Sequence, residues 1–447
     1  MSSVSIKKLA IKGAIWAIAT YGTSQILRFG SNLILTRLLA PKLFGLMALV
    51  YVFISGLHLF SDVGLGPSII QNKRGNDPAF LNTAWTLQVI RSVILWVGCL
   101  LIAWPVSRFY NEPQLVWLLP LVGLNTLISG FNSTALFTLN RELAVREIAL
   151  YEMGGQVVSI GVMIVWAYFH PSIMALVVGS MVSVFIQMIW SHRLNSGHPN
   201  RFAWEPEAMK ELISFGKWIF LSTAMTFLAA QTDRLVLGKL LSIELLGIYG
   251  IAFTLADMPR QVILAISDKV IFPAFSKFAG LPRSEFRAKI EKNRSLLLVG
   301  MAVILAVVVA FGDLAVSFLY DNRYEDAAWM LPVLALGIWP IVLTQTIDAA
   351  LFAVGNPRFV ALGCFFSFLA LAIGIPGGYA LWGSLGAVGA VSLSNIPPYM
   401  CITYGLWREK LACLWQDLWS TLLFIALLGG VLALRHALGL AFPVVSL

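Results

Sequence analysis

The chain has 447 residues, of which 59% are hydrophobic and 12% are charged, and its formal net charge is +9 at pH 7. Soluble domains carry roughly a quarter charged residues, so this composition excludes an ordinary soluble protein and favours one embedded in the bilayer. The basic residues fall in short segments between apolar runs, and they therefore report membrane topology rather than nucleic-acid binding. The four cysteines are scattered singly, with no histidine set near them, and are interpreted as buried apolar residues rather than metal ligands.

Long apolar runs predict an all-α membrane protein with about thirteen transmembrane helices, within a range of about twelve to fourteen. A transmembrane β-barrel would instead show shorter segments of alternating polarity. In the first half we expect spans at 13–36, 44–70, 83–104, 115–139, 148–169 and 173–190. In the second half we expect spans at 213–237, 245–271, 296–320, 331–354, 359–376, 384–404 and 418–434. Residues 437–447 are too few for a further full span, so a fourteenth is expected only if they pair with part of the preceding one.

The ends of these spans predict the orientation of the chain. No small-residue cleavage site follows a short apolar core near the amino terminus, so we expect the first span to stay in the membrane. With the amino terminus in the cytoplasm, most Lys and Arg residues lie on the cytoplasmic side, among them Arg294, while a minority that includes Arg435 lies on the opposite side. This bias predicts a multi-pass protein of the inner (plasma) membrane.

The two halves of the chain resemble each other. A shift of 202 residues places Trp16 on Trp218, Leu39 on Leu241 and Gly45 on Gly247. Such an internal repeat in the same orientation predicts two parallel six-helix bundles around a central cavity. The expected division is an amino-terminal bundle at 1–190, a cytoplasmic linker at 191–211, a carboxy-terminal bundle at 212–404 and an extra helix within 405–447.

Polar and charged residues inside the expected spans are the candidates for function, because each costs roughly 2.5 to 3.5 kcal/mol on insertion scales. Most of them lie on the first two spans of each half, as a cavity at the repeat interface predicts. The candidate residues that would line the cavity and bind substrate are Gln25, Arg28, Asn32, His58, Asp62, Arg91, Asp233, Arg234, Asp257, Arg260 and Asp348. A catalytic group and a metal site are not expected among them.

Structural explanations remain open for several of these residues. Arg91 and Asp348 lie a few residues from a span end, where they could reach the headgroups or form structural pairs. Asp233 and Arg234 could be solvated at the interface, and His58 could be a hydrogen-bonded core histidine. Arg28 lies deep in its span, where it could instead form a structural pair with Asp62 or Asp257.

A guanidinium group in a water-filled cavity suits a phosphate ligand, because its planar fork donates two charge-assisted hydrogen bonds and stays protonated. An anionic lipid head group is therefore a reasonable ligand for Arg28 and Arg260. The sequence has no G-x-x-x-x-G-K-S/T motif for an ATP-driven motor, and it has no D-x-D pair for a nucleotide sugar.

Three segments carry a resemblance to a known family. They are LTRLLAPKLFGL at 35–46, SDVGLGPSIIQ at 61–71 and LNRE at 139–142. These segments resemble the polysaccharide and lipid-linked oligosaccharide flippases of the multidrug/oligosaccharidyl-lipid/polysaccharide exporter superfamily. The resemblance implies that helices 1, 2, 7 and 8 line a central cavity.

We therefore expect a non-enzymatic, alternating-access flippase for a polyprenyl-diphosphate-linked oligosaccharide. The expected protein is a monomer without a bound cofactor, coupled to a proton or sodium gradient, in contact with membrane lipid and with glycosyltransferases or a polymerase of its pathway. A cation-coupled drug exporter of the same fold is the first alternative, which altered drug tolerance on deletion would favour. A membrane-embedded glycosyltransferase or polymerase is the second, which turnover of a sugar donor would favour.

Overall fold

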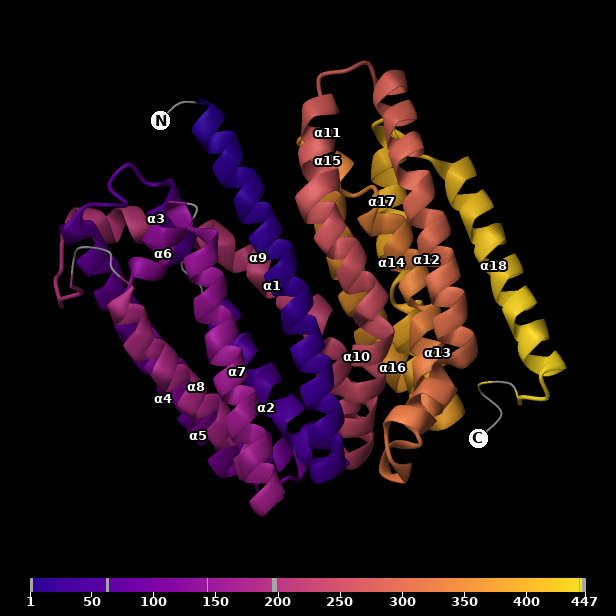
Figure 1. Ribbon diagram of the computed structural model, residues 1–447, viewed down its shortest axis with the longest axis horizontal. Helices are drawn as coiled ribbons and strands as arrows, with labels where there is room; N and C mark the ends of the chain where they lie inside the picture. The colour runs from indigo at the N-terminus through magenta and orange to yellow at the C-terminus, as the bar shows by residue number, and fades with distance from the viewer. Residues whose placement is uncertain (1–2, 62–63, 143, 195–198, 442, 444–447) are drawn as a thin grey trace. The chain divides into compact units, whose positions relative to one another are not determined.

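The computed structural model describes residues 3–61, 64–142, 144–194, 199–441 and 443; within these, the side chains of 3–15, 17–19, 21, 213–225 and 268–269 are not described. The chain forms two compact units, Met1–Ala224 and Met225–Leu447. They are called the N-terminal and the C-terminal unit below. The helices of both are drawn in Figure 1.

The N-terminal unit is helical, and its long helices coincide with the expected spans. It contains α1 (Ser3–Leu38), α2 (Pro41–Phe60), α3 (Leu65–Gln71), α4 (Pro78–Tyr110), α5 (Leu115–Gly130), α6 (Ala135–Arg141), α7 (Val145–Phe169), α8 (Met174–Arg193) and the first part of α9 (Pro206–Leu240). Two expected spans are interrupted. The span expected at 44–70 ends at Phe60 and is followed by the short helix α3, and the span expected at 115–139 is bent by 61° between α5 and α6.

The C-terminal unit holds the rest of α9 and eleven further elements. They are α10 (Ile243–Ile266), the π-helical turn η1 (Ser267–Ile271), α11 (Phe272–Phe278), α12 (Arg283–Leu319), the 3-10 turn η2 (Asn322–Tyr324), α13 (Ala327–Leu336), α14 (Ile338–Gln345), α15 (Ala349–Ala353), α16 (Arg358–Leu393), α17 (Ile396–Arg408) and α18 (Leu414–Ala437). The span expected at 331–354 is divided into α13, α14 and α15. The spans expected at 359–376 and 384–404 meet inside α16, where Gly383 has φ 59 and ψ −141. A left-handed φ favours glycine because it has no Cβ, and this residue lets the chain turn between the two segments.

Among the described residues, eight helical stretches are long and apolar enough to cross a membrane, or nine if α5 and α6 form one bent span. The protein is therefore an all-α, multi-pass membrane protein. Helices α1, α9 and α10 coincide with further expected spans but are not among those eight. The expected total of about thirteen spans stays a prediction.

Helix ends preserve the repeat seen in the sequence. Helix α1 ends at Leu38 and α9 ends at Leu240, while α2 begins at Pro41 and α10 begins at Ile243. Both the two ends and the two starts are 202 residues apart. The local geometry agrees as well, because Leu39 donates its backbone N–H to Leu35 at 2.8 Å and Leu241 donates to Leu237 at 2.8 Å. The division into two parallel six-helix bundles at the predicted boundaries stays a prediction.

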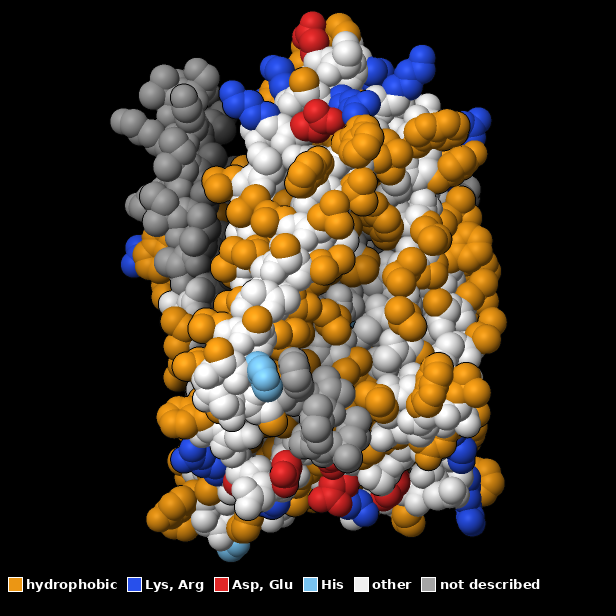
Figure 2. Space-filling model, turned by 90° about the vertical axis from the view of Figure 1, so that its right-hand side faces the viewer, with side chains coloured by type: hydrophobic (Ala, Val, Ile, Leu, Met, Phe, Trp, Pro, Cys, Tyr) orange, Lys and Arg blue, Asp and Glu red, His pale blue; other side chains and the backbone are white. Residues whose placement is uncertain are grey.

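Apolar side chains cover the outside of the molecule as well as its core. On the face shown in Figure 2, hydrophobic side chains cover the middle, and charged side chains gather toward the top and bottom. Large exposed hydrophobic residues of the C-terminal unit include Leu296, Phe318 and Ile425. A broad apolar belt between charged rims suits a surface that faces lipid.

Candidate functional site

A polar cavity of about 230 Å³ lies within the N-terminal unit. Its lining residues come from α2, α4, α5 and the bend that follows α5. They are His58, Gln88, Arg91, Ser92, Leu95, Thr126, Ser129, Gly130 and Asn132. Nearly all of these can form hydrogen bonds through their side chains, which is unusual for the interior of a membrane protein.

The bend between α5 and α6 shapes this cavity. When a helix breaks, carbonyl groups near its end lose their intrahelical partners and need others. The Gln88 Nε2 group of α4 supplies them, donating to the carbonyl oxygens of Gly130 at 2.9 Å and Asn132 at 3.0 Å. Gln88 therefore stabilises the bend, and the bend holds the Asn132 side chain at the cavity wall.

Arg91 and His58 join α4 and α5 to α2. Arg91 donates through one nitrogen to the His58 carbonyl at 2.7 Å and through Nε to Ser61 Oγ at 2.9 Å. The His58 ring places Nε2 3.1 Å from Thr126 Oγ1 on α5. Both candidates are half-buried and lie in one site, and the ring contact agrees with the alternative of a hydrogen-bonded histidine in the core. Asp62, one turn after His58, lies outside the described residues.

One buried acceptor of a lining residue has no protein partner among the described residues. The Asn132 side-chain Oδ1 is buried and accepts no hydrogen bond. An unsatisfied buried carbonyl oxygen costs about 1 to 3 kcal/mol, unless water or a ligand supplies the missing donor.

The polar face of α1 lies outside this cavity. The Arg28 side chain is exposed and forms no ion pair with any described residue, while Ser31 donates to the Arg28 carbonyl at 2.9 Å. Asp62 lies outside the described residues and Asp257 belongs to the C-terminal unit, so the structural pairs considered for Arg28 stay predictions. Gln25 and Asn32 are half-buried on the same helix.

The charged candidates of the C-terminal unit form local pairs on α9 and α10. Asp233 is 5% exposed and accepts a hydrogen bond from the Tyr249 hydroxyl at 2.6 Å. The alternative of interface solvation is therefore wrong for Asp233. The Arg234 guanidinium lies 5.4 Å from the ring centroid of Phe253.

Asp257 and Arg260 lie one turn apart on α10 and form a bidentate ion pair. Gln261 donates a further hydrogen bond to Asp257 at 2.6 Å. The expectation that Arg260 is a cation available for a phosphate group is therefore not supported, because its charge is already matched. Asp348 is half-buried directly before α15, away from the other candidates of this unit in the sequence.

Two buried arginines were not predicted from the sequence. Arg294 and Arg435 were expected at opposite membrane surfaces, but they are 1% and 2% exposed. Arg294 pairs with Asp417 at 2.5 Å, and Arg435 pairs with Asp313 at 2.5 Å. Both pairs join α12 to α18, so these charges hold helices together and do not line the polar cavity of the N-terminal unit.

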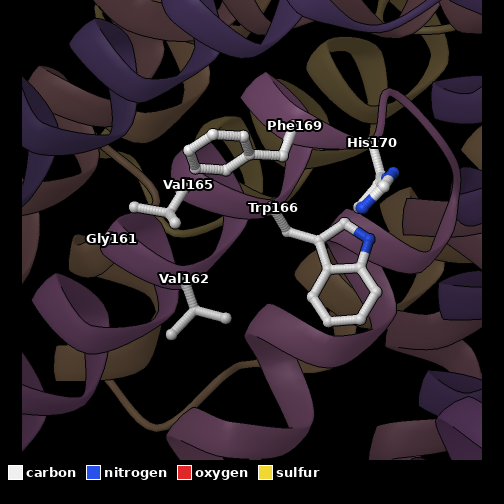
Figure 3. A pocket seen from close by; sticks show the side chains of 6 residues that line it. All are labelled: Gly161, Val162, Val165, Trp166, Phe169 and His170. Carbon is white, nitrogen blue, oxygen red and sulfur yellow. The ribbon is translucent and has the colours of Figure 1, made fainter.

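A second cavity, of about 420 Å³, differs in character. Figure 3 shows its lining residues, which are Gly161, Val162, Val165, Trp166 and Phe169 near the end of α7 and His170 directly after it. His170 is the only imidazole in this wall. The space is an open apolar groove on one helix, and it lacks the converging polar groups of a binding site.

Outside the membrane spans, Arg74 links the loop before α4 to the segment before α9. It contacts Asp77 at 2.7 Å and Glu205 at 2.7 Å. The hydrogen bond that Arg74 donates to Asp77, together with a second from the Ala79 backbone N–H, holds the pKa of Asp77 below the usual range of an aspartate. The same segment docks on α4, because the Ala203 and Glu205 N–H groups donate to threonine hydroxyls of that helix at 3.1 Å.

Comparison with known families gives one match that covers most of the chain. The family described as "Polysaccharide biosynthesis protein" matches residues 34–329. This range includes the polar cavity, the α9–α10 pairs and all of α12.

Two curated relatives are about a quarter identical to this chain over the aligned residues. The teichuronic acid biosynthesis protein TuaB of Bacillus subtilis is 23% identical over 283 residues, which are 63% of this chain and 57% of that protein. The lipopolysaccharide biosynthesis protein WzxC of Escherichia coli is 24% identical over 366 residues, which are 79% of this chain and 70% of that protein. The chain thus spans little more than half the length of the first relative.

Solved structures show the same fold. An inward closed structure of the lipid II flippase MurJ matches with a TM-score of 0.70 at 12% identity, covering 93% of this chain and 91% of MurJ. An inward-facing multidrug resistance transporter of the MATE family matches with a TM-score of 0.63 at 15% identity, covering 90% of this chain and 95% of that one. These identities are low, so the matches establish fold and not substrate.

Proposed function

The chain belongs to the polysaccharide biosynthesis family of flippases, within the multidrug/oligosaccharidyl-lipid/polysaccharide exporter superfamily, and we propose that it moves a polyprenyl-diphosphate-linked oligosaccharide across the inner membrane. The match over residues 34–329 is the observation that carries this proposal. It favours a lipid-linked glycan over a small drug molecule, although the MATE transporters have the same fold. The proposed direction is from the cytoplasmic to the periplasmic leaflet, with the amino terminus in the cytoplasm.

Arg28 is the proposed ligand of the diphosphate. It is exposed on a polar helix face and forms no ion pair with a described residue of its own unit, so binding an anion does not require it to leave a carboxylate partner there. A guanidinium group stays charged at any physiological pH and can donate two parallel hydrogen bonds to phosphate oxygens. Arg260 already donates to Asp257 and serves this role less well.

Transport requires that the affinity of Arg28 for the diphosphate change during the cycle. A ligand shifts the equilibrium between two conformations only through its different affinities for them. The glycan would cross through a polar path while the polyprenyl chain stays in the bilayer. A proton or sodium gradient is the proposed energy source.

Deletion of the gene tests the function. Cells without the protein should accumulate lipid-linked repeat units at the cytoplasmic leaflet, and their drug tolerance should be unchanged. A plasmid copy of the wild-type gene should restore export. Altered drug tolerance without accumulation of the lipid would instead identify a small-molecule exporter.

A further inference from the structure

We propose that one end of the C-terminal unit binds an anionic phospholipid. Lys289 and Lys292 of α12 would contact its phosphate head group, and the exposed apolar face of the same helix would contact an acyl chain. This inference concerns the lipid around the protein and goes beyond the transported substrate. It is carried by the unmatched charge at this end, by the apolar face beside it and by the length of that face.

Several helix ends of the C-terminal unit meet around one core. Phe275 of α11, Phe286 of α12, Leu351 of α15 and Leu406 of α17 belong to a single buried cluster. The outer surface of this end carries exposed basic side chains, which are called the basic rim below. They are Lys277, Lys289, Lys292, Arg358, Arg408 and Lys410.

The charges of the basic rim are largely unmatched. None of its six side chains forms an ion pair with a described residue of the same unit. Glu291 already pairs with Arg287 at 3.0 Å. Glu409 already pairs with Arg283 at 3.2 Å. Among the described side chains at this end, Glu285 is the exposed acid without an ion pair. One carboxylate does not neutralise six cations, so the rim suits an anionic partner.

Within the rim, Lys289 and Lys292 lie at the start of an exposed apolar face. Residues three or four positions apart share one face of an α-helix. Leu296, Val299 and Val303 continue the face of the two lysines along α12, and they are 80%, 45% and 45% exposed. The described part of the unit therefore leaves this face open to lipid.

The length of the face matches one leaflet of a bilayer. From Lys292 to Val303, α12 rises roughly 16 Å at about 1.5 Å per residue, and half of a hydrocarbon core of about 30 Å is about 15 Å. A Cβ atom at Gly300, within this stretch, would have no neighbour within 4 Å. Figure 2 shows Lys and Arg side chains at the top of the molecule, above a middle of hydrophobic ones. Head-group cations followed by one leaflet of open apolar surface have the dimensions of a phospholipid.

The expected topology and the contacts of Lys289 also favour this ligand. The sequence predicts that this end lies at the cytoplasmic surface, where the leaflet is negatively charged and each nearby Lys or Arg raises lipid affinity by about fivefold. The Lys289 Nζ atom lies 4.4 Å from the ring centroid of Phe278, which positions the ammonium group without neutralising it. A nucleic acid or an acidic soluble protein would use the rim alone, and neither would cover an apolar face of this length.

Lipid quenching at a labelled residue tests the site. Ser295→Cys is introduced into protein whose four native cysteines are replaced, and a fluorophore is attached to it. The protein is reconstituted in phosphatidylcholine vesicles that contain a small amount of spin-labelled phosphatidylglycerol or, in a parallel sample, the same amount of spin-labelled phosphatidylcholine. Quenching should report an enrichment of phosphatidylglycerol of at least about fivefold. The enrichment should largely disappear at about 1 M salt, where the Debye length is about 3 Å.

Ser317→Cys is the matched control for the labelled position. Ser295 and Ser317 are exposed residues of α12, and each donates its hydroxyl to a carbonyl about one turn earlier at 3.0 Å. Ser317 lies at the other end of the apolar segment, beside the exposed Phe318. A fluorophore at this position should be quenched equally by the two lipids.

Two pairs of lysine substitutions test the charge. Lys289→Gln with Lys292→Gln should remove the preference reported at Ser295→Cys, while Lys289→Arg with Lys292→Arg should keep it. Lys73→Gln with Lys210→Gln removes two exposed lysines of the N-terminal unit and should leave the preference unchanged. Because all four lysines are exposed, the melting temperatures of these proteins should match that of the wild type.

Four outcomes would overturn the inference. They are equal quenching by both lipids at Ser295→Cys, an equal preference at Ser317→Cys, a preference that survives the Lys289→Gln and Lys292→Gln pair, and an equal loss of preference in the Lys73→Gln and Lys210→Gln protein. The first would identify the rim as a solvated surface, and the last would show that only net charge matters. Glycan transport does not enter this experiment, so its result is distinguishable from failure of the proposed function.

Discussion

Arg294 on α12 and Asp417 on α18 form a buried ion pair, and the same two helices are joined again by Arg435 and Asp313. Each helix contributes one arginine and one aspartate, and both run in the same direction. Residues 294 and 313 lie roughly 28 Å apart along α12 at about 1.5 Å per residue, which is close to the hydrocarbon thickness of a bilayer. The two pairs therefore fasten α18 to α12 near both ends of the apolar segment (Figure 1).

Removing one member of the Arg294–Asp417 pair should destabilise the C-terminal unit. Arg294 also donates to Thr346 Oγ1 at 2.7 Å and to the Leu343 carbonyl at 2.5 Å. Arg294→Met removes these two hydrogen bonds and leaves the buried Asp417 without its cation, although the Tyr399 hydroxyl still donates to it at 3.1 Å. We expect a loss of about 3 to 5 kcal/mol in the free energy of unfolding. Denaturation of the purified protein in detergent micelles measures it.

Two further variants are the controls for that loss. The double variant Arg294→Met with Asp417→Leu should recover much of the stability, because no buried charge remains unpaired. Arg287→Ala breaks a partly exposed pair with Glu291 on the same helix, and should cost less than about 1 kcal/mol. A double variant as unstable as the single one would contradict this explanation.

The Tyr249 hydroxyl should be needed to bury Asp233. Asp233 Oδ1 has no partner among the described residues, and Oδ2 accepts from Tyr249. Tyr249→Phe should therefore cost about 1 to 3 kcal/mol in the free energy of unfolding, and adding Asp233→Asn should reduce that cost. Equal stability of Tyr249→Phe and the wild-type protein in the same denaturation experiment would contradict the pairing.

Close backbone contact inside α16 should make Gly378 intolerant of a side chain. A Cβ atom at Gly378 would lie 2.3 Å from the Gly386 carbonyl oxygen, across the turn at Gly383. Gly378→Ala should lower stability by about 1 to 3 kcal/mol because the two segments must separate. Gly389→Ala places a Cβ in open space and is the matched control. Similar melting temperatures of the two variants would argue against this contact.

Acidification should loosen the loop before α4, in which Asp77 pairs with Arg74. The pKa of Asp77 is lowered by Arg74, so the contribution of this contact is complete above the unfolded value of about 3.9 and is lost as pH falls through the lower folded pKa. Proteolysis at residues 72–77 should therefore be constant between about pH 7 and 5 and should accelerate below about pH 4.

The Arg74→Ala variant tests the cause of that pH dependence. It should be cleaved faster already at pH 7, with a modest effect because the pair is partly exposed. Arg323→Ala removes a similar exposed pair with Asp321 in the C-terminal unit, and should leave cleavage at 72–77 unchanged. Equal cleavage of the Arg74→Ala and wild-type proteins would contradict the proposed tether.

The sequence predicts the positions of the helices well, because hydropathy and helix length depend on local composition. It predicts the breaks less well, since the bend after α5 depends on Gln88 binding carbonyl groups some forty residues later. Arg294 was assigned to the membrane surface because it follows a basic segment, and its partner Asp417 is far away in the sequence. Spacing could have suggested the pair, because 294 and 313 repeat almost the separation of 417 and 435.

The residues of the candidate site were also predicted only in part from the sequence. His58 and Arg91 were identified from the cost of polar groups in a span, and the structure brings them together. Asn132 was missed because a neutral amide near a span end is unremarkable in sequence. Its position in the cavity wall, at the bend after α5, marks it as a candidate.

Transport by the purified protein tests the central proposal most directly. Proteoliposomes should move a fluorescent polyprenyl-diphosphate-linked glycan between leaflets, Arg28→Ala should abolish this movement, and Arg28→Lys should restore it only in part because the planar fork is lost. Arg37→Ala, at the exposed end of the same helix, should transport normally. Wild-type transport by Arg28→Ala at equal abundance would contradict the role of Arg28, and absence of glycan movement in wild-type proteoliposomes would contradict the proposed function.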